Sequence, residues 1–177
     1  MIEDTVDRLR TEATRIRLAA LPAAERHYAA ESPWYYTVYW LGVPSSILAA
    51  VAGATAFSEL KYSGAIAGGI SIVVAVLSAL STFLDPAKKA AAHHLAAKGY
   101  EALYHNAGFF CRIEALDDSI QLGNRTKLLS ALKDKLNELG AASPPIPGRA
   151  AKRAQLNIER GWGEVVRDPQ EIARSDA

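Results

Sequence analysis

Three histidines in the middle of the chain are the residues best suited to metal chemistry. His93, His94 and His105 lie in one predicted helix, and the last two fall near the same helical face. Neighbouring histidines in a helix point in different directions, and no cysteine or carboxylate completes a known ligand spacing. We therefore expect no metal ion and no other cofactor.

The remaining residues of catalytic type also lack a context that would activate them. The glycine-rich segment 64–69 lies inside an apolar run, which indicates helix packing rather than a phosphate-binding loop. Cys111 is the one cysteine, so it cannot form an intramolecular disulfide, as is usual for cytosol-facing proteins. Glu114, Asp117 and Asp118 fit a solvated helix face. The chain is not predicted to be an enzyme, and its net charge of +1 gives no indication of nucleic-acid binding.

A stripe of small and hydroxyl-bearing residues suggests a narrow, uncharged conduit. Ser71, Ala75, Ser78 and Thr82 recur at spacings of four, three and four, so they share one helical face. In a ring of subunits this face could line a pore, and apolar neighbours could close it by dewetting. Ordinary helix packing stays open as the alternative for each residue, because hydroxyls in lipid can bond to their own helix.

Further small residues in the same part of the chain would allow helices to approach closely. Helix association in lipid depends on such residues, because lipid is as apolar as the side chains themselves. The packing can lie within one hairpin or between copies, and the sequence leaves both alternatives open. The candidates are Gly42, Ser46 and Gly53 in a first apolar run and Gly64 and Gly68 in a second.

The two apolar runs predict a membrane hairpin. Within residues 32–84 the only charged residues are Glu59 and Lys61. Spans at about 38–57 and 65–84 each provide the roughly 20 residues that a helix needs to cross a hydrocarbon core of about 30 Å. A buried hairpin in a soluble protein is the alternative, but the rest of the chain is too charged to enclose two apolar helices. A cleaved signal peptide does not fit, because a charged helix precedes the first run.

The positions of the basic residues predict the orientation of this hairpin. Of the 20 Lys and Arg residues, all but Lys61 lie outside residues 32–84. The positive-inside rule therefore places both termini in the cytoplasm and the short turn outside, with the lipid bilayer as a partner. The expected anchors at the membrane interface are Trp34, Tyr35 and Trp40 before and within the first span, and Lys88 and Lys89 after the second.

Composition divides the chain into four segments of an all-α protein. Residues 1–31 form a cytoplasmic amphipathic helix, because apolar residues recur there every three or four positions. Residues 32–84 form the transmembrane hairpin, and residues 85–140 form cytoplasmic helices. Residues 141–177 comprise a Pro-rich linker, a short helix and a frayed tail.

Prolines and glycines indicate the helix boundaries. Pro22 either interrupts the first helix or starts a new one, whereas Asp85 and Pro86 favour a new helix with Asp as its N-cap. The elements expected after that point are a helix over about 87–110, another over about 112–139 that Gly123-Asn124 would break, a cap at Gly140 and a last helix over 149–162.

One cytoplasmic helix is predicted to carry an assembly seam. Four leucines recur along residues 128–136, more than one helix of a membrane-tethered monomer is expected to hide. We therefore expect these side chains to pack against neighbouring helices, partly across subunits of a homo-oligomer. They are Leu128, Leu129, Leu132 and Leu136.

Four segments follow one another in a recognisable layout. They are an amphipathic helix leading to Pro33-Trp34-Tyr35, two spans joined by a short turn, the run from Phe83 to Lys89, and the His- and Tyr-bearing helix from Ala92 to Tyr104. This layout resembles the SLATT domain family, the two-span effector domains associated with bacterial cyclic-oligonucleotide synthetases and nucleotide-sensing partners. The resemblance covers about residues 5–165 and depends on hydropathy layout more than on invariant residues.

This resemblance implies a function that the residues alone do not demonstrate. Members of the family are thought to act in antiphage defence by oligomerising into pores that disrupt the bacterial inner membrane, which causes growth arrest or cell death. It also implies a sensor or nucleotide synthetase encoded nearby as a partner. The alternatives are a membrane-anchored oligomeric scaffold and a small-solute channel subunit of routine physiology.

Overall fold

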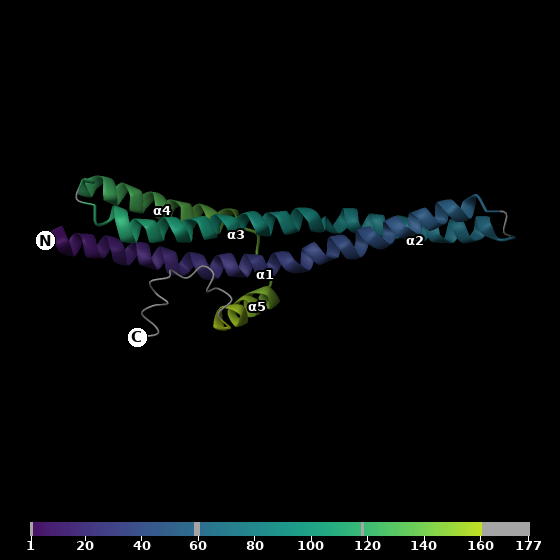
Figure 1. Ribbon diagram of the computed structural model, residues 1–177, viewed down its shortest axis with the longest axis horizontal. Helices are drawn as coiled ribbons and strands as arrows, with labels where there is room; N and C mark the ends of the chain where they lie inside the picture. Colours follow the sequence, from purple (N-terminus) through teal and green to yellow (C-terminus); the bar gives the residue numbers. More distant parts are fainter. Residues whose placement is uncertain (1, 59–60, 118, 161–177) are drawn as a thin grey trace. The chain divides into compact units, whose positions relative to one another are not determined.

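The computed structural model describes residues 2–58, 61–117 and 119–160, and all regular elements in this part are helices (Figure 1). This confirms the all-α expectation. The chain divides into two units, which we call the core unit (residues 1–30 and 92–177) and the hairpin unit (residues 31–91). The elements are α1 (Ile2–Ala56), α2 (Ser63–Leu84), α3 (Pro86–Phe109), a π-helical segment (Phe110–Glu114), α4 (Leu122–Ala142) and α5 (Gly148–Glu159).

Helix α1 continues through three prolines. Pro22, Pro33 and Pro44 all lie inside it, so the expectation that Pro22 interrupts or restarts the helix is wrong. A proline in a helix interior removes one backbone hydrogen bond and normally costs about 3 kcal/mol. Near Pro22 the flanking residues Ala20 and Ala24 are buried in the core unit. Tertiary packing of that kind can outweigh a local break.

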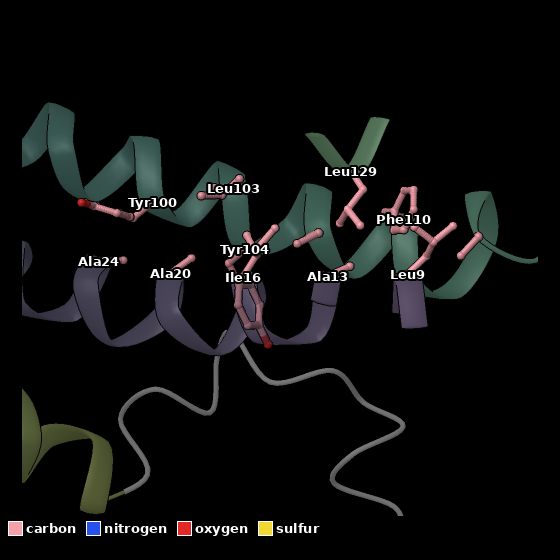
Figure 2. Packing of buried hydrophobic residues seen from close by; sticks show 12 residues of the cluster. Leu9, Ala13, Ile16, Ala20, Ala24, Tyr100, Leu103, Tyr104, Phe110 and Leu129 are labelled. Atoms are coloured by element: carbon pink, nitrogen blue, oxygen red, sulfur yellow. The ribbon is translucent and has the colours of Figure 1, made fainter. Parts of the chain in front are cut away.

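The core of the first unit joins α1, α3 and α4 (Figure 2). The buried residues of α1 recur every three or four positions, as expected for one face of a helix. Small alanines on α1 face aromatic side chains on α3, so the two backbones can approach while the rings fill the space between them. The cluster comprises Leu9, Ala13, Ile16, Ala20 and Ala24 of α1, Tyr100, Leu103, Tyr104 and Ala107 of α3, and Phe110, Ala115 and Leu129.

Two local features join α4 to α3. A Cβ added at Gly99 would lie 2.6 Å from Leu139 Cδ2, so the absence of a side chain permits this close approach. The buried Arg125 donates to the carbonyl oxygens of Ala115 (3.0 Å) and Asp117. These carbonyls belong to the turn after the π-helical segment, which the guanidinium therefore holds against α4.

Two predicted boundaries in this region are wrong. Helix α4 begins at Leu122, so the break precedes Gly123-Asn124 and both of these residues lie inside α4. Arg125 holds the preceding turn through the Ala115 carbonyl. Helix α4 also continues through Gly140 and ends at Ala142, followed by Ser143. The linker and the short helix after it occur as expected, with α5 over Gly148–Glu159. The predicted tail, like Asp118 and Glu59, lies outside the described residues.

The hairpin unit consists of the later part of α1, α2 and the start of α3. Its turn includes Phe57, Ser58, Lys61 and Tyr62. Helix α2 ends at Leu84 and is followed by Asp85, which has a φ of 43°, a left-handed conformation that Asp adopts more readily than most residues. Helix α3 then begins at Pro86, and the Lys88 amide donates to Asp85 Oδ1 at 3.4 Å. The predicted N-cap and first-turn proline are therefore confirmed.

Candidate functional site

The two helices of the hairpin unit pack along one line of each. Partly or fully buried residues recur at alternating spacings of three and four, a pattern typical of two helices in lengthwise contact. On α1 this line comprises Trp34, Val38, Leu41, Ser45, Leu48, Ala52 and Thr55. On α2 it comprises Ala67, Ile70, Val74, Leu77, Ser81 and Leu84.

The hydroxyl stripe of α2 lies outside this contact line. Ser71, Ala75, Ser78 and Thr82 are all exposed. At about 100° per residue, the stripe is centred roughly 100° around the helix from the contact line. The structure thus places the four residues on one open face of α2, available to another molecule.

The hydroxyl groups of this stripe have a defined hydrogen-bonding state. Ser71 Oγ donates to the Ala67 carbonyl at 2.8 Å, and Thr82 Oγ1 donates to the Ser78 carbonyl at 3.0 Å. A hydroxyl that donates within its own helix still has oxygen lone pairs for accepting. The face can therefore offer acceptors to water or to a cation without carrying a charge.

The five candidate packing residues also point away from the hairpin contact. Gly42, Ser46, Gly53, Gly64 and Gly68 are exposed. A Cβ added at any of the four glycines would meet nothing within 4 Å. Of the two alternatives left open by the sequence, contact within the hairpin therefore does not hold for them, and packing between copies stays a prediction.

The outer surface of the hairpin unit is strongly apolar. Two helical regions contain a stretch long and apolar enough to cross a membrane. They are Asp4–Ala56, which lies within α1, and Ser63–Glu114, which runs from α2 through the π-helical segment. Very little of either apolar stretch is buried. The core helix of a soluble protein would hide most of that stretch, so the exposure weakens the soluble alternative. Exposed large side chains of the hairpin unit include Trp40, Ile47, Phe57, Ile72, Val76 and Phe83.

The predicted interface anchors include one direct pair. Lys89 Nζ lies 4.4 Å from the centre of the Trp34 ring, a cation–π contact between the two ends of the hairpin. Tyr35 is half-exposed, and its hydroxyl lies 3.0 Å from that of Tyr39. Trp40 is 76% exposed and Lys88 is also exposed. This set of bases and amphipathic rings is the kind found at headgroup level.

The predicted assembly seam is largely internal to the core unit. Leu129 is buried, and Leu132 and Leu136 pack against the same cluster. These leucines therefore pack against neighbouring helices of the same chain, as predicted. Contacts across subunits stay a prediction. Leu128 is 37% exposed and lines a groove between α3 and α4 of about 390 Å³.

The histidines have structural partners. His93 is buried, whereas His94 lies edge-on to Tyr28 and His105 beside Tyr104. No group of three or more His, Cys, Asp or Glu side chains able to hold a metal occurs among the described residues. Cys111 is half-buried, with its Sγ 3.6 Å from both Thr14 Oγ1 and the Arg10 carbonyl oxygen.

The sequence did not reveal a buried histidine pair. His27 Nδ1 lies 3.1 Å from His93 Nδ1, and the His27 ring stacks on Tyr100. One imidazole must donate to the other, so the Nδ1 atom of the accepting ring carries no proton and that ring is neutral. Burial, and next the charge of His93, lower the pKa of His27. No local signal links residues this far apart in the chain, because only the register of α1 against α3 brings them together.

Comparisons with protein-family models, with curated proteins and with solved structures each found no match for this chain.

Proposed function

We propose that this chain is a membrane protein whose hairpins assemble into a pore in the bacterial inner membrane. The observation that carries the proposal is the exposed apolar surface of the hairpin unit. Leaving that surface in water is costly, at about 25 cal/mol for each Å² of apolar area. Lipid and neighbouring hairpins would cover it, and the chain would be a multi-pass protein.

The pore is built from α2 in this proposal. The Ser71–Thr82 stripe is the most polar open face of that helix, and it lies to one side of the hairpin contact. When copies assemble in a ring, the polar face turns toward the axis and the apolar face toward lipid. A side of α2 centred roughly 110° around the helix from the stripe carries Ile72, Val76 and Phe83, which suit lipid. A conduit of this kind has acceptor oxygens but no charged ring, so we expect weak selectivity and closure by dewetting.

The physiological role follows from the resemblance to the SLATT family. In that role the chain is an antiphage effector that depolarises the inner membrane and arrests or kills the infected cell. A sensor or nucleotide synthetase encoded nearby would supply the activating signal. A membrane-anchored scaffold is the second candidate, because the helical core unit could assemble without any conduit.

An ion-flux experiment separates the pore from the scaffold. Purified protein is reconstituted into liposomes with a potassium gradient, and a voltage-sensitive dye reports flux. We expect flux from the wild type and none from Ser78→Leu, which places a bulky side chain on the conduit face. The matched control is Val76→Leu, because this exposed residue lies roughly 160° around the helix from Ser78, on the lipid-facing side. It should conduct like the wild type.

Two results would contradict this proposal in different ways. A wild type that inserts but carries no ions favours the scaffold. A Ser78→Leu variant that conducts at wild-type oligomer size shows that this face is not the constriction, and the first span then becomes the better candidate. Oligomer size is measured in the same sample, because overpacking a helix contact can cost about 1–3 kcal/mol.

The proposed orientation places both termini in the cytoplasm. In a Cys111→Ser background, single cysteines at Ser63 and at Ala142 report the two sides of the membrane. An impermeant thiol reagent applied to cells with a permeabilised outer membrane should label position 63 and spare position 142. The reverse labelling would overturn the orientation.

The proposed contact across subunits in the core unit has its own test. Leu128→Asp changes a partly exposed groove residue instead of the buried Leu129. If a second copy covers the groove, the solubilised protein should shift to smaller species. Unchanged oligomer size would leave Leu128 outside the assembly surface.

A further inference from the structure

Helix α5 presents a basic surface that the core unit does not use. Its buried residues Ala150 and Ala154 pack against Ala29 and Ala30 of α1, with Ile146 beside them (Figure 1). The helix has three exposed bases, which at 100° per residue fall within an arc of roughly 100° on another side of the helix. They are Arg149, Lys152 and Arg153, with the half-exposed Leu156 among them, and the exposed Arg160 follows the last residue of the helix.

These bases are not neutralised inside the described part of the chain. Arg149, Lys152 and Arg153 form no ion pair with any described residue. The nearest acid in the helix, Glu159, accepts a hydrogen bond from Gln155 Nε2 at 3.1 Å. Among the described residues the basic face therefore keeps an excess of positive charge, and it fits an anionic partner.

The place where α5 attaches indicates which partner that is. Ala30 precedes Trp34 by only four residues in the sequence. Trp34 carries the cation–π contact with Lys89 and is an expected headgroup-level residue. A short chain connection of this kind keeps α5 near the expected start of the membrane span, where an anionic leaflet attracts basic residues.

We propose that the basic face of α5 binds anionic lipid headgroups of the cytoplasmic leaflet. This inference rests on the proposed membrane insertion of the hairpin. Guanidinium groups bind phosphate oxygens through paired hydrogen bonds, and a long side chain can extend toward the headgroups. Leu156 is placed to enter the interface between the bases, as apolar residues of interfacial helices do. The binding of α5 to the membrane would then depend on the fraction of anionic lipid.

Hydrogen exchange of the full chain in nanodiscs tests this binding. The exchange rate of amides in residues 148–160 is compared in phosphatidylcholine discs and in discs with 30% phosphatidylglycerol. Each base near an anionic surface contributes about fivefold in binding, so we expect exchange to slow at least about fivefold in the anionic discs. The effect should disappear in 0.5 M NaCl, because salt screens the attraction.

Matched double variants isolate the basic face. Arg149→Gln with Arg153→Gln should lose the protection by anionic lipid, whereas Lys127→Gln with Lys133→Gln, two exposed bases of α4, should retain it. If the first variant already exchanges faster in neutral discs, the wild-type comparison between lipids and salts decides the question alone.

Each further outcome has a distinct meaning. Equal exchange of the wild type in both kinds of disc overturns headgroup binding and leaves the membrane proposal intact. If inorganic phosphate slows exchange in neutral discs as much as anionic lipid does, the basic face binds a free anion. That result also overturns headgroup binding. Failure of the wild type to enter nanodiscs overturns the membrane proposal itself.

Discussion

The core unit and the hairpin unit arrange the same kinds of side chain in opposite ways. In the core unit aromatic and aliphatic residues such as Phe110 and Leu103 are fully buried. In the hairpin unit Phe83 and Trp40 are largely exposed, while Ala52 and Ala67 are buried. A helix in water hides large apolar residues, and a helix in lipid gains nothing by hiding them. This difference supports the proposed insertion of the hairpin unit into a membrane.

Polar groups show the same contrast. The buried His27, His93 and Arg125 of the core unit all bond to residues far along the chain or across a turn. Helical hydroxyls bond to the carbonyl four residues earlier in both units, as Thr14 does in the core unit and Ser71 in the hairpin unit. Water is absent from a bilayer core, so a polar side chain there is satisfied most simply by its own helix. Long-range polar pairs thus occur where the fold has a tertiary core.

Truncating a phenylalanine in each unit should give the largest difference. Phe110 is fully buried and Phe83 is 87% exposed. Phe110→Ala leaves a cavity and should cost the core unit about 3–5 kcal/mol, whereas Phe83→Ala should change its stability by about 0.5 kcal/mol or less. Hydrogen exchange of residues 100–110 measures the opening free energy in both variants. Equal losses would mean that the two units do not differ in this way.

The second-largest difference between the units should come from replacing one exposed apolar residue of each with lysine. Ile72, near the middle of α2, is 68% exposed, and Leu18 of α1 is 65% exposed. At the centre of a membrane span Lys costs about 2.5–3.5 kcal/mol, but on a water-facing helix it costs almost nothing. Ile72→Lys should therefore reduce the membrane-inserted fraction, and Leu18→Lys should not. The fraction that resists alkaline extraction measures this, and equal fractions would count against the membrane assignment of α2.

Glycine-to-alanine changes sharpen the comparison at smaller magnitude. A Cβ at Gly99 meets Leu139, and one at Gly68 meets nothing within 4 Å. Gly99→Ala should destabilise the core unit by about 1–3 kcal/mol, reduced if the end of Leu139 turns aside. Gly68→Ala should leave the chain folded but weaken contacts between hairpins. Thermal unfolding and oligomer size distinguish the two, and an unchanged oligomer for Gly68→Ala would remove Gly68 from the contact between copies.

Acid should have the smallest effect, confined to the core unit. The pKa of His27 is lowered by burial and by His93, so the unfolded chain takes up a proton more readily than the folded one. Stability from this group is complete above its unfolded pKa of about 6.5 and falls as the pH drops below that value. His27→Gln has no titrating ring and should lose less stability between pH 7.5 and 5.5 than the wild type. Equal losses in thermal unfolding would exclude His27 as the cause.

The sequence predicted the elements better than their partners. The apolar runs, the Asp85-Pro86 start and the Pro-rich linker depend on local chemistry, so they could be found in advance. The Pro22 boundary was wrong because long-range packing outweighed a local preference, and α4 ends two residues beyond the predicted Gly140 cap. The open position of the Ser71–Thr82 stripe could not be predicted, because periodicity gives a face of a helix but not the side on which its neighbour packs.

By itself the sequence determined that the chain is helical and that one stretch of it has the length and apolarity of a membrane hairpin. These properties follow from residue type and spacing along a single helix. Only the tertiary structure decided which faces are covered: Leu129 inside the core unit, the glycines outside the hairpin contact, and His27 against His93. The reason is that a contact between distant residues depends on the register of two helices, which no local pattern encodes.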